Sequence, residues 1–218
     1  GKVVDTNSSY LAHAFEACGA EVVSIRLVRD KADEIREALR IESMQSDIVL
    51  TTGGLGPTSD DITQETVANF LGESLEINAE SLERLKAKYA SRGRTLNENS
   101  SRQARFPSSA KIFANPVGTA DASLSSCSSK EHLCFIASLP GVPKEMKALV
   151  KQEILPWFKT QFPALKPRLE AHLKIFGISE SYIGTQIDSL NLPAEITTAY
   201  RPTFPEVLVT FSTPDTGP

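Results

Sequence analysis

The sequence has little cysteine, no dense basic cluster and no long apolar run. Its three cysteines, Cys18, Cys127 and Cys134, give neither a disulfide framework nor a metal-ligand spacing, and they suit a reducing compartment. The net charge of −4, from 23 basic and 27 acidic residues, has the wrong sign for a nucleic-acid-binding stripe. No apolar run approaches the roughly 18 residues that a membrane-spanning helix needs. These absences favour a cytoplasmic protein without nucleic-acid or membrane partners.

What the sequence does contain is typical of a globular protein. Its 218 residues, 40% hydrophobic and 23% charged, are enough for one medium domain with an apolar core and a small appendage. The chain opens at Gly1, directly before a helix cap at 5–7, and we expect a first strand to be missing ahead of it.

Strands and helices are predicted to alternate along most of the chain. Apolar, β-branched runs predict strands at residues 22–28, 47–52, 111–114 and 133–137. The serine-rich stretch that ends at Ser129 is predicted to be a turn. This alternation predicts a three-layer α/β domain with a mostly parallel sheet over residues 1–164. Residues 165–218, which follow a proline-rich stretch, are expected to form a small α+β domain.

The most informative segment is DIVLTTGGLGPTSDDIT, residues 47–63. It is a buried strand, a glycine loop and a helix start, which is where ligands bind in open α/β sheets. Glycines let backbone N–H groups approach an anion, and the helix N-terminus adds its positive end. The segment has neither the Walker pattern nor the GxGxxG pattern. The predicted ligand-binding residues here are Thr52, Gly53, Gly54, Leu55, Gly56, Pro57 and Thr58.

Two adjacent carboxylates, Asp60 and Asp61, follow this glycine loop. One interpretation is a tight turn in which Asp60 or Ser59 only caps a helix. The other is that both carboxylates hold a divalent metal ion that bridges a bound phosphate. The pair favours the second interpretation, with Asp60 and Asp61 as metal-binding and catalytic residues.

Two more loops follow predicted strands and have a similar character. Each alone is an ordinary turn, but loops at one sheet edge converge on a shared cleft. Their predicted ligand-binding residues are Asn115, Gly118 and Thr119 in one loop and Pro140, Gly141, Pro143 and Glu145 in the other. A polar cluster faces either the same cleft or solvent: Asn97, Asn99, Arg102 and Gln103.

These motifs together resemble the amino-terminal region of the CinA family, within the wider molybdopterin-binding superfamily of MoaB, MogA and gephyrin-like domains. The matching segments are GKVVDTNSSYLA, TTGGLGPTSDDIT, LNENSSRQARFP, NPVGTA and LPGVPKEM. The tail from about Leu165, with FGISES and RPTFPEV, resembles the small domain that follows in CinA proteins. The family's carboxy-terminal deamidase domain has no counterpart here. Asp121-Ala122 stands where the family usually has Pro-Gly.

The resemblance implies a molybdopterin-binding-like α/β fold and homo-oligomerisation. For some members it also implies a metal-dependent pyrophosphatase that acts on ADP-ribose, with Asp60 and Asp61 on a divalent ion that activates water. In MogA-like relatives the same cleft binds molybdopterin. The alternative is therefore a molybdopterin- or nucleotide-binding module without turnover. Both need the same phosphate cradle, so sequence leaves both open.

Overall fold

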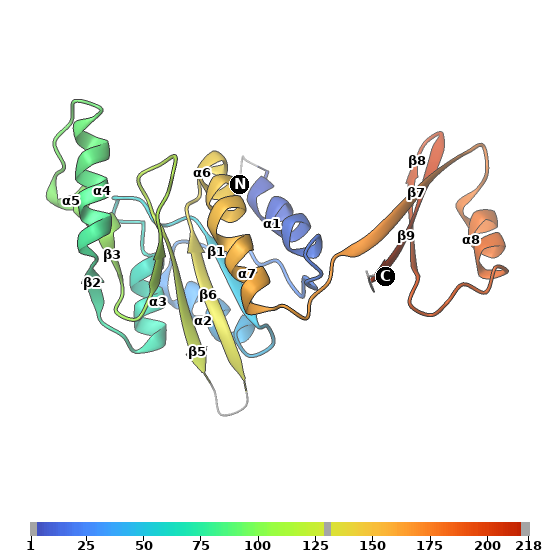
Figure 1. Ribbon diagram of the computed structural model, residues 1–218, viewed down its shortest axis with the longest axis horizontal. Coiled ribbons are helices and arrows are strands. Elements are labelled where there is room, and N and C mark those ends of the chain that lie inside the picture. The colour runs from blue at the N-terminus through green and yellow to red at the C-terminus, as the bar shows by residue number, and fades with distance from the viewer. Residues whose placement is uncertain (1–3, 129–131, 215–218) are drawn as a thin grey trace. The chain divides into compact units, whose positions relative to one another are not determined.

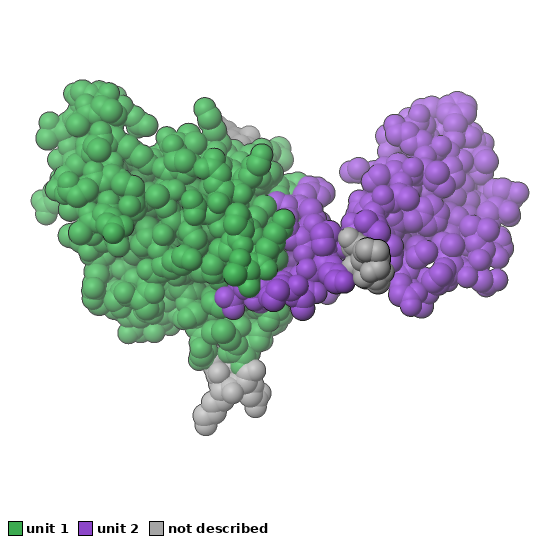
Figure 2. Space-filling view, viewed as in Figure 1, with its two compact units in different colours: residues 1–12, 22–160 green, residues 13–21, 161–218 purple. Residues whose placement is uncertain are grey.

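The computed structural model describes residues 4–128 and 132–214, which form two compact units (Figure 2). Residues 4–12 and 22–160 belong to the first unit, and residues 13–21 and 161–214 belong to the second. The boundary between 164 and 165 stays a prediction for the domain division. Among the described residues, no helix is both long and apolar enough to cross a membrane.

The first unit is built on a four-stranded sheet in the order β1-β6-β5-β4 (Figure 1). The strands are β1 (Ile48–Thr52), β4 (Lys111–Phe113), β5 (Ala122–Ser128) and β6 (Leu133–Leu139). β1 pairs in parallel with β6, whereas β5 is antiparallel to both of its neighbours. Three of these four strands, β1, β6 and β4, therefore run in the same direction. The sheet is mixed because the short connections around β5 cannot supply the crossover that parallel neighbours require.

Helices cover both faces of this sheet. On one face α2 (Ala32–Glu42) and α3 (Thr63–Leu71) pack their apolar residues against Ile136 of β6. On the other face the Phe135 ring contacts the Trp157 ring edge-on, with centroids 5.1 Å apart. Trp157 lies in α7 (Leu155–Gln161), which continues α6 (Pro143–Leu149) through a π-helical turn, η2 (Val150–Ile154). Phe135 and Ile136 are consecutive strand residues, so their side chains lie on opposite faces of the sheet. Helices therefore cover both faces, and the predicted three-layer α/β class is confirmed.

A helical arm extends from the first unit (Figure 1). A two-stranded antiparallel sheet of β2 (Leu75–Ile77) and β3 (Arg105–Pro107) forms its base. Between these strands the chain forms α4 (Ala79–Ala90), α5 (Glu98–Ser101) and the 3₁₀ helix η1 (Arg102–Ala104). We call residues 75–107 the arm. α1 (Thr6–Glu16) completes the described helices before residue 161.

The second unit is a small α+β structure, as predicted. Its antiparallel sheet has the order β7-β9-β8, from β7 (Arg168–Phe176), β9 (Glu206–Pro214) and β8 (Thr197–Thr203). The single described helix between β7 and β8 is α8 (Glu180–Asp188). Its Ile183 packs against Val207 and Val209 of the central strand, and these three residues form the core.

The predicted strand at 22–28 is wrong. The segment is extended but makes no sheet pairing with any described strand, and Val23, Ile25 and Leu27 stay exposed. Its polar residues instead bind α2, where Ser24 Oγ and Arg26 Nε donate to the buried Glu42 carboxylate. The Ser24 hydrogen bond holds the pKa of Glu42 below its usual value. β-branched composition favours a strand only where a neighbouring strand offers a ladder.

The serine-rich turn predicted up to residue 129 is also wrong, because residues 122–128 form β5 in the interior of the sheet. Serine has little intrinsic preference for strands, but its small side chain fits between two covering layers. Ser123 is 1% exposed and exchanges hydrogen bonds with Gln64 of α3. Ser129 itself lies outside the described residues.

Candidate functional site

The glycine loop after β1 folds back onto the start of α3. Gly53 N donates to Leu139 O at 2.9 Å, and Thr63 Oγ1 donates to Gly53 O at 2.9 Å. Gly53 and Gly54 have φ values of +103° and +66°, which favour glycine. A Cβ on Gly54 would lie 2.2 Å from Thr63 Oγ1. The sharp reversal at this loop therefore requires glycine.

This loop leaves backbone donors free. Within the described part of the chain, the N–H groups of Gly54, Leu55 and Gly56 have no hydrogen-bond acceptor. Consecutive free N–H groups beside a helix N-terminus are a typical anion-binding arrangement. The predicted phosphate-binding geometry is therefore available at these three residues.

Asp61 stabilises the glycine loop from within. Its carboxylate accepts hydrogen bonds from the backbone N and the hydroxyl of Thr58, and it lies against Gly56, where a Cβ would be 2.4 Å from Oδ2. Asp60 is exposed, and its interaction with the nearby Thr58 side chain lowers its pKa. α3 has Ile62 at its N-cap and no side-chain cap, so neither Asp60 nor Ser59 caps this helix.

The two aspartates offer few ligands to a metal ion. Across residues 4–128 and 132–214, no group of three or more His, Cys, Asp and Glu side chains could hold one. Asp61 is already bound to Thr58, which leaves Asp60 as the fully accessible carboxylate. This donor set fits a hard cation such as Mg²⁺, which is often bound by one or two carboxylates together with water and ligand phosphate.

The second predicted loop, 115–119, is held from inside by Asn115. This residue is 2% exposed, and its Nδ2 donates to Ala120 O and to Glu145 Oε2, each at 2.8 Å. Its Oδ1 accepts from the backbone N of Val117 and of Gly118. The Asn115 amide thus shapes the loop and is not free to bind a ligand. A Cβ on Gly118 would overlap the Glu145 carboxylate, so glycine is needed for this contact.

The third predicted loop, 140–145, touches the glycine loop. A Cβ on Gly141 would be 3.1 Å from Gly53 Cα, and Thr52 Oγ1 donates to Pro140 O. Asn7 Nδ2 donates to Gly141 O and to Thr52 Oγ1, which ties both loops to α1. Pro143 occupies the first turn of α6, where its missing N–H costs nothing. Sequence reasoning missed Asn7, because its pattern indicated only a helix cap.

Gln103 of the arm joins the first two loops. Its Nε2 donates to Leu55 O at 3.2 Å and to Thr119 Oγ1 at 3.4 Å. The three loops therefore lie next to one another, but the second and third predicted loops do not line the cavity described below, and a cleft shared by all three stays a prediction. The loops are neighbours because each follows the carboxyl end of β1, β4 or β6, the three strands that share a direction.

A cavity of about 230 Å³ lies between the glycine loop and the arm. Gly54, Leu55 and Gly56 of the loop line it together with Arg102, Gln103 and Arg105 of the arm. Of the predicted polar cluster, Arg102 and Gln103 therefore reach the cavity, whereas Asn97 instead caps α5 by accepting from Ser100 N. Asn99 does not line the cavity.

Asp121 anchors the second loop to the arm, a role that the sequence pattern did not indicate. It is 4% exposed; its Oδ1 accepts from Asn115 N, and its Oδ2 accepts from Ser81 Oγ and the Arg84 guanidinium. Lys88 of the arm also contacts the second loop, because its Nζ donates hydrogen bonds to two carbonyl oxygens of that loop. Burial lowers the pKa of Lys88, while the nearby Asp121 opposes that shift.

Comparison with known proteins shows which families the chain is similar to. The family of probable molybdopterin binding domains matches residues 1–160. A CinA-like protein from Escherichia coli (strain SMS-3-5 / SECEC) and the NMN amidohydrolase-like protein YfaY from Escherichia coli (strain K12) are each 36% identical over 207 residues, 94% of this chain and 50% of each relative. The chain thus spans about half the length of these curated relatives.

A solved structure extends the comparison to the fold. The crystal structure of the protein CinA from Thermoplasma acidophilum matches with a TM-score of 0.64 and 36% identity, covering 72% of this chain and 89% of that one. The chain therefore belongs to the CinA-like family and, over residues 1–160, to the probable molybdopterin binding domains.

Proposed function

We propose that the three converging loops bind the phosphate of a pterin or nucleotide ligand, so that the chain acts as a phosphate-ligand-binding module. The observation that carries this proposal is the set of free N–H groups at Gly54, Leu55 and Gly56, beside the cavity. Consecutive free N–H groups in a loop bind phosphate oxygens by hydrogen bonds without any further charge. The name of the matched domain family supports a pterin as one such ligand.

Titration calorimetry with ADP-ribose, without divalent metal, tests the proposal. Gly54→Ala places a Cβ against Thr63 and distorts the free donors, so we expect affinity to fall more than about ten-fold. Gly93→Ala is the matched control, because Gly93 also has a positive φ, of +65°, but does not line the cavity. Equal affinity of Gly54→Ala and the wild type would refute the proposal.

A second candidate function is metal-dependent hydrolysis of a diphosphate bond, of the ADP-ribose pyrophosphatase type. It is favoured by Asp60 and Asp61, two adjacent carboxylates after the glycine loop, of which Asp60 is exposed and Asp61 lines the cavity. Asp60 and Asp61 would hold the divalent ion, which would neutralise the diphosphate and make water more acidic. The loop N–H groups would orient the phosphates.

Hydrolysis of ADP-ribose with Mg²⁺ or Mn²⁺ separates this candidate from a binding module. We expect Asp60→Ala to remove most turnover while metal-free ADP-ribose binding is retained, because Asp60 supports no loop contact outside Thr58. Asp61→Ala should weaken both turnover and metal-free ADP-ribose binding, because the Asp61 carboxylate accepts a hydrogen bond from Thr58 and so stabilises the loop. Ser59→Ala is the control. Unchanged turnover in both aspartate variants would exclude the hydrolase.

A further inference from the structure

Two arginines of the arm line the same cavity as the glycine loop. Arg102 lies in η1 and Arg105 begins β3, and both line the cavity together with Gln103, which is hydrogen-bonded to the glycine loop at Leu55. The arm therefore brings two arginines to the cavity that the loop residues with free N–H groups also line.

The acidic residues around the cavity do not neutralise this pair. Three of the four acids on its walls already accept hydrogen bonds from other parts of the protein: Asp61 from Thr58, Asp121 from Arg84, and Glu73 from Ser109. The fourth, Glu65, has Oε2 at 4.0 Å from Arg102 Nη2, with both side chains partly in solvent. An exposed ion pair at this distance contributes little.

Arg105 has no partner at all within the described residues. Its side chain makes no hydrogen bond or ion pair there, and the residue is half-buried and lines the cavity. An arginine guanidinium presents a rigid fork of donors that matches the oxygens of phosphate or carboxylate. An arginine at the cavity without a protein partner leaves these donors available to such an oxyanion.

We propose that Arg105, assisted by Arg102, forms a second oxyanion subsite, so that the cavity selects ligands carrying a second anionic group beyond the phosphate held by the glycine loop. The second group is a carboxylate or a phosphate, since both present paired oxygens to the fork. The glycine loop would bind the first phosphate, and the arm would decide which phosphate compounds bind. This inference rests on the proposed phosphate-binding function.

Two matched pairs of small probes test the subsite by calorimetry. Glycerol 3-phosphate and 3-phosphoglycerate share a three-carbon skeleton, but only the latter adds a carboxylate; orthophosphate and pyrophosphate differ by one phosphate. We expect the wild type to bind the two-anion member of at least one pair about ten-fold more tightly, as a charge-assisted hydrogen bond implies. The pair that shows the preference identifies the second group.

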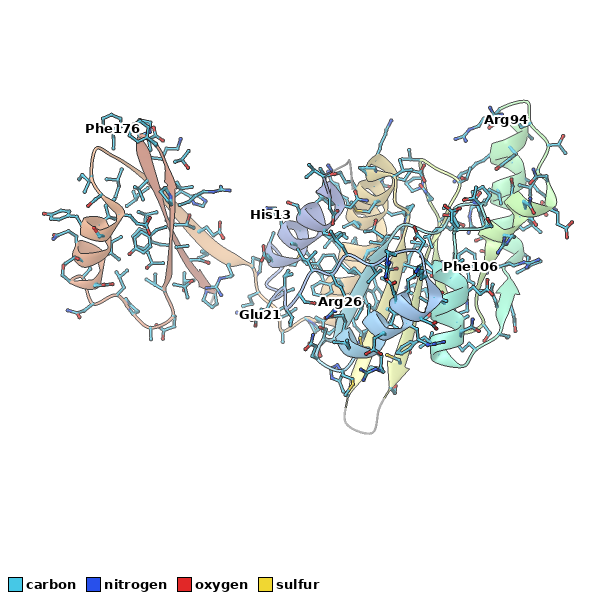
Figure 3. All side chains as sticks on the ribbon, turned by 180° about the vertical axis from the view of Figure 1, so that it is seen from behind. His13, Glu21, Arg26, Arg94, Phe106 and Phe176 are labelled. Atoms are coloured by element: carbon cyan, nitrogen blue, oxygen red, sulfur yellow. The ribbon has the colours of Figure 1, made fainter. Side chains whose placement is uncertain are left out.

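Variants then assign the preference to Arg105. Arg105→Gln should abolish it without changing the affinity for single-anion probes, and Arg105→Lys should retain only part of it, because lysine keeps the charge but loses the fork. Arg94→Gln removes the same charge from an exposed arginine of the same arm and should leave the preference intact. Figure 3 shows Arg94 at the outer end of the arm, far from Phe106, the residue next to Arg105.

The outcomes separate the two proposals. Single-anion binding that depends on Gly54 but shows no preference for a second anion would overturn the subsite and leave the proposed function standing. A preference that persists in Arg105→Gln would also overturn the subsite. If Gly54→Ala binds every probe as the wild type does, or if the wild type binds none of them, both proposals fail.

Discussion

Replacing Asp121 with alanine should be among the most damaging single changes in the first unit. Its buried carboxylate accepts hydrogen bonds from the Asn115 backbone, from Ser81 and from Arg84, so it joins the second loop to α4. Alanine would leave the Arg84 guanidinium and the Asn115 N–H without their acceptor. The loop that carries Thr119 would lose its tie to the arm.

The structure allows the size of this effect to be worked out. Removing one member of a buried ion pair costs about 3–5 kcal/mol, because the remaining charge stays desolvated. The Arg84 side chain is 33% exposed, against 4% for Asp121, so water can partly solvate the arginine after the substitution. We therefore expect Asp121→Ala to lower the free energy of unfolding by about 3 kcal/mol, near the bottom of that range.

Urea unfolding followed by circular dichroism measures this change. An m-value equal to that of the wild type would show that unfolding exposes the same amount of surface in both proteins. Glu80→Ala is the control, because Glu80 Oε2 lies 3.8 Å from the same arginine but its side chain is 88% exposed. That variant should lose less than about 0.5 kcal/mol. If Asp121→Ala loses no more than Glu80→Ala, the loop is not held by this carboxylate and the reasoning is refuted.

Two further predictions concern other regions. Gly184→Ala lies inside α8, where an added Cβ meets no atom within 4 Å and φ is not positive, so the second unit should become more stable by up to about 1 kcal/mol; a lower Tm would contradict this. Burial raises the pKa of the Cys134 thiol from 9.0 to about 12. The unfolded thiol therefore ionises first, and the free energy of unfolding should fall as pH rises from 9 towards 12. Cys134→Ala should show a shallower pH dependence in urea titrations over that range, and an equal slope would refute the assignment.

The glycine loop was predictable from sequence because its determinants are local. An apolar strand, three glycines and a helix start lie within 47–63, and each restricts the backbone of its own residues; the strand itself is only partly buried, at one end of the described sheet. The convergence of the three loops was also predictable, because it needs only strands that leave the sheet at one edge. The antiparallel pairing of β5 with both neighbours does not move the second loop to the other edge of the sheet, since β4 still runs in the same direction as β6.

The roles of single polar residues were not predictable in this way. Asn7 and Asp121 each act through partners more than 30 positions away in the chain, such as Thr52 for Asn7 and Arg84 for Asp121. Asn115 has a nearer set of partners, but these turn its amide inward instead of towards a ligand. The spacing of residues in the sequence does not indicate which hydrogen-bond partner a buried carboxylate or amide will have.

By itself the sequence determined the α/β class, the family resemblance and the position of the glycine loop, since periodicity and glycine placement act on neighbouring residues. Tertiary structure alone decided that the serine-rich 122–128 is an interior strand and that the apolar 22–28 pairs with none of the described strands. It also decided that Arg105 lines the same cavity as the glycine loop. The physical reason is that ladders, buried ion pairs and cavities form between distant segments, and their free energy depends on which segments the fold brings together.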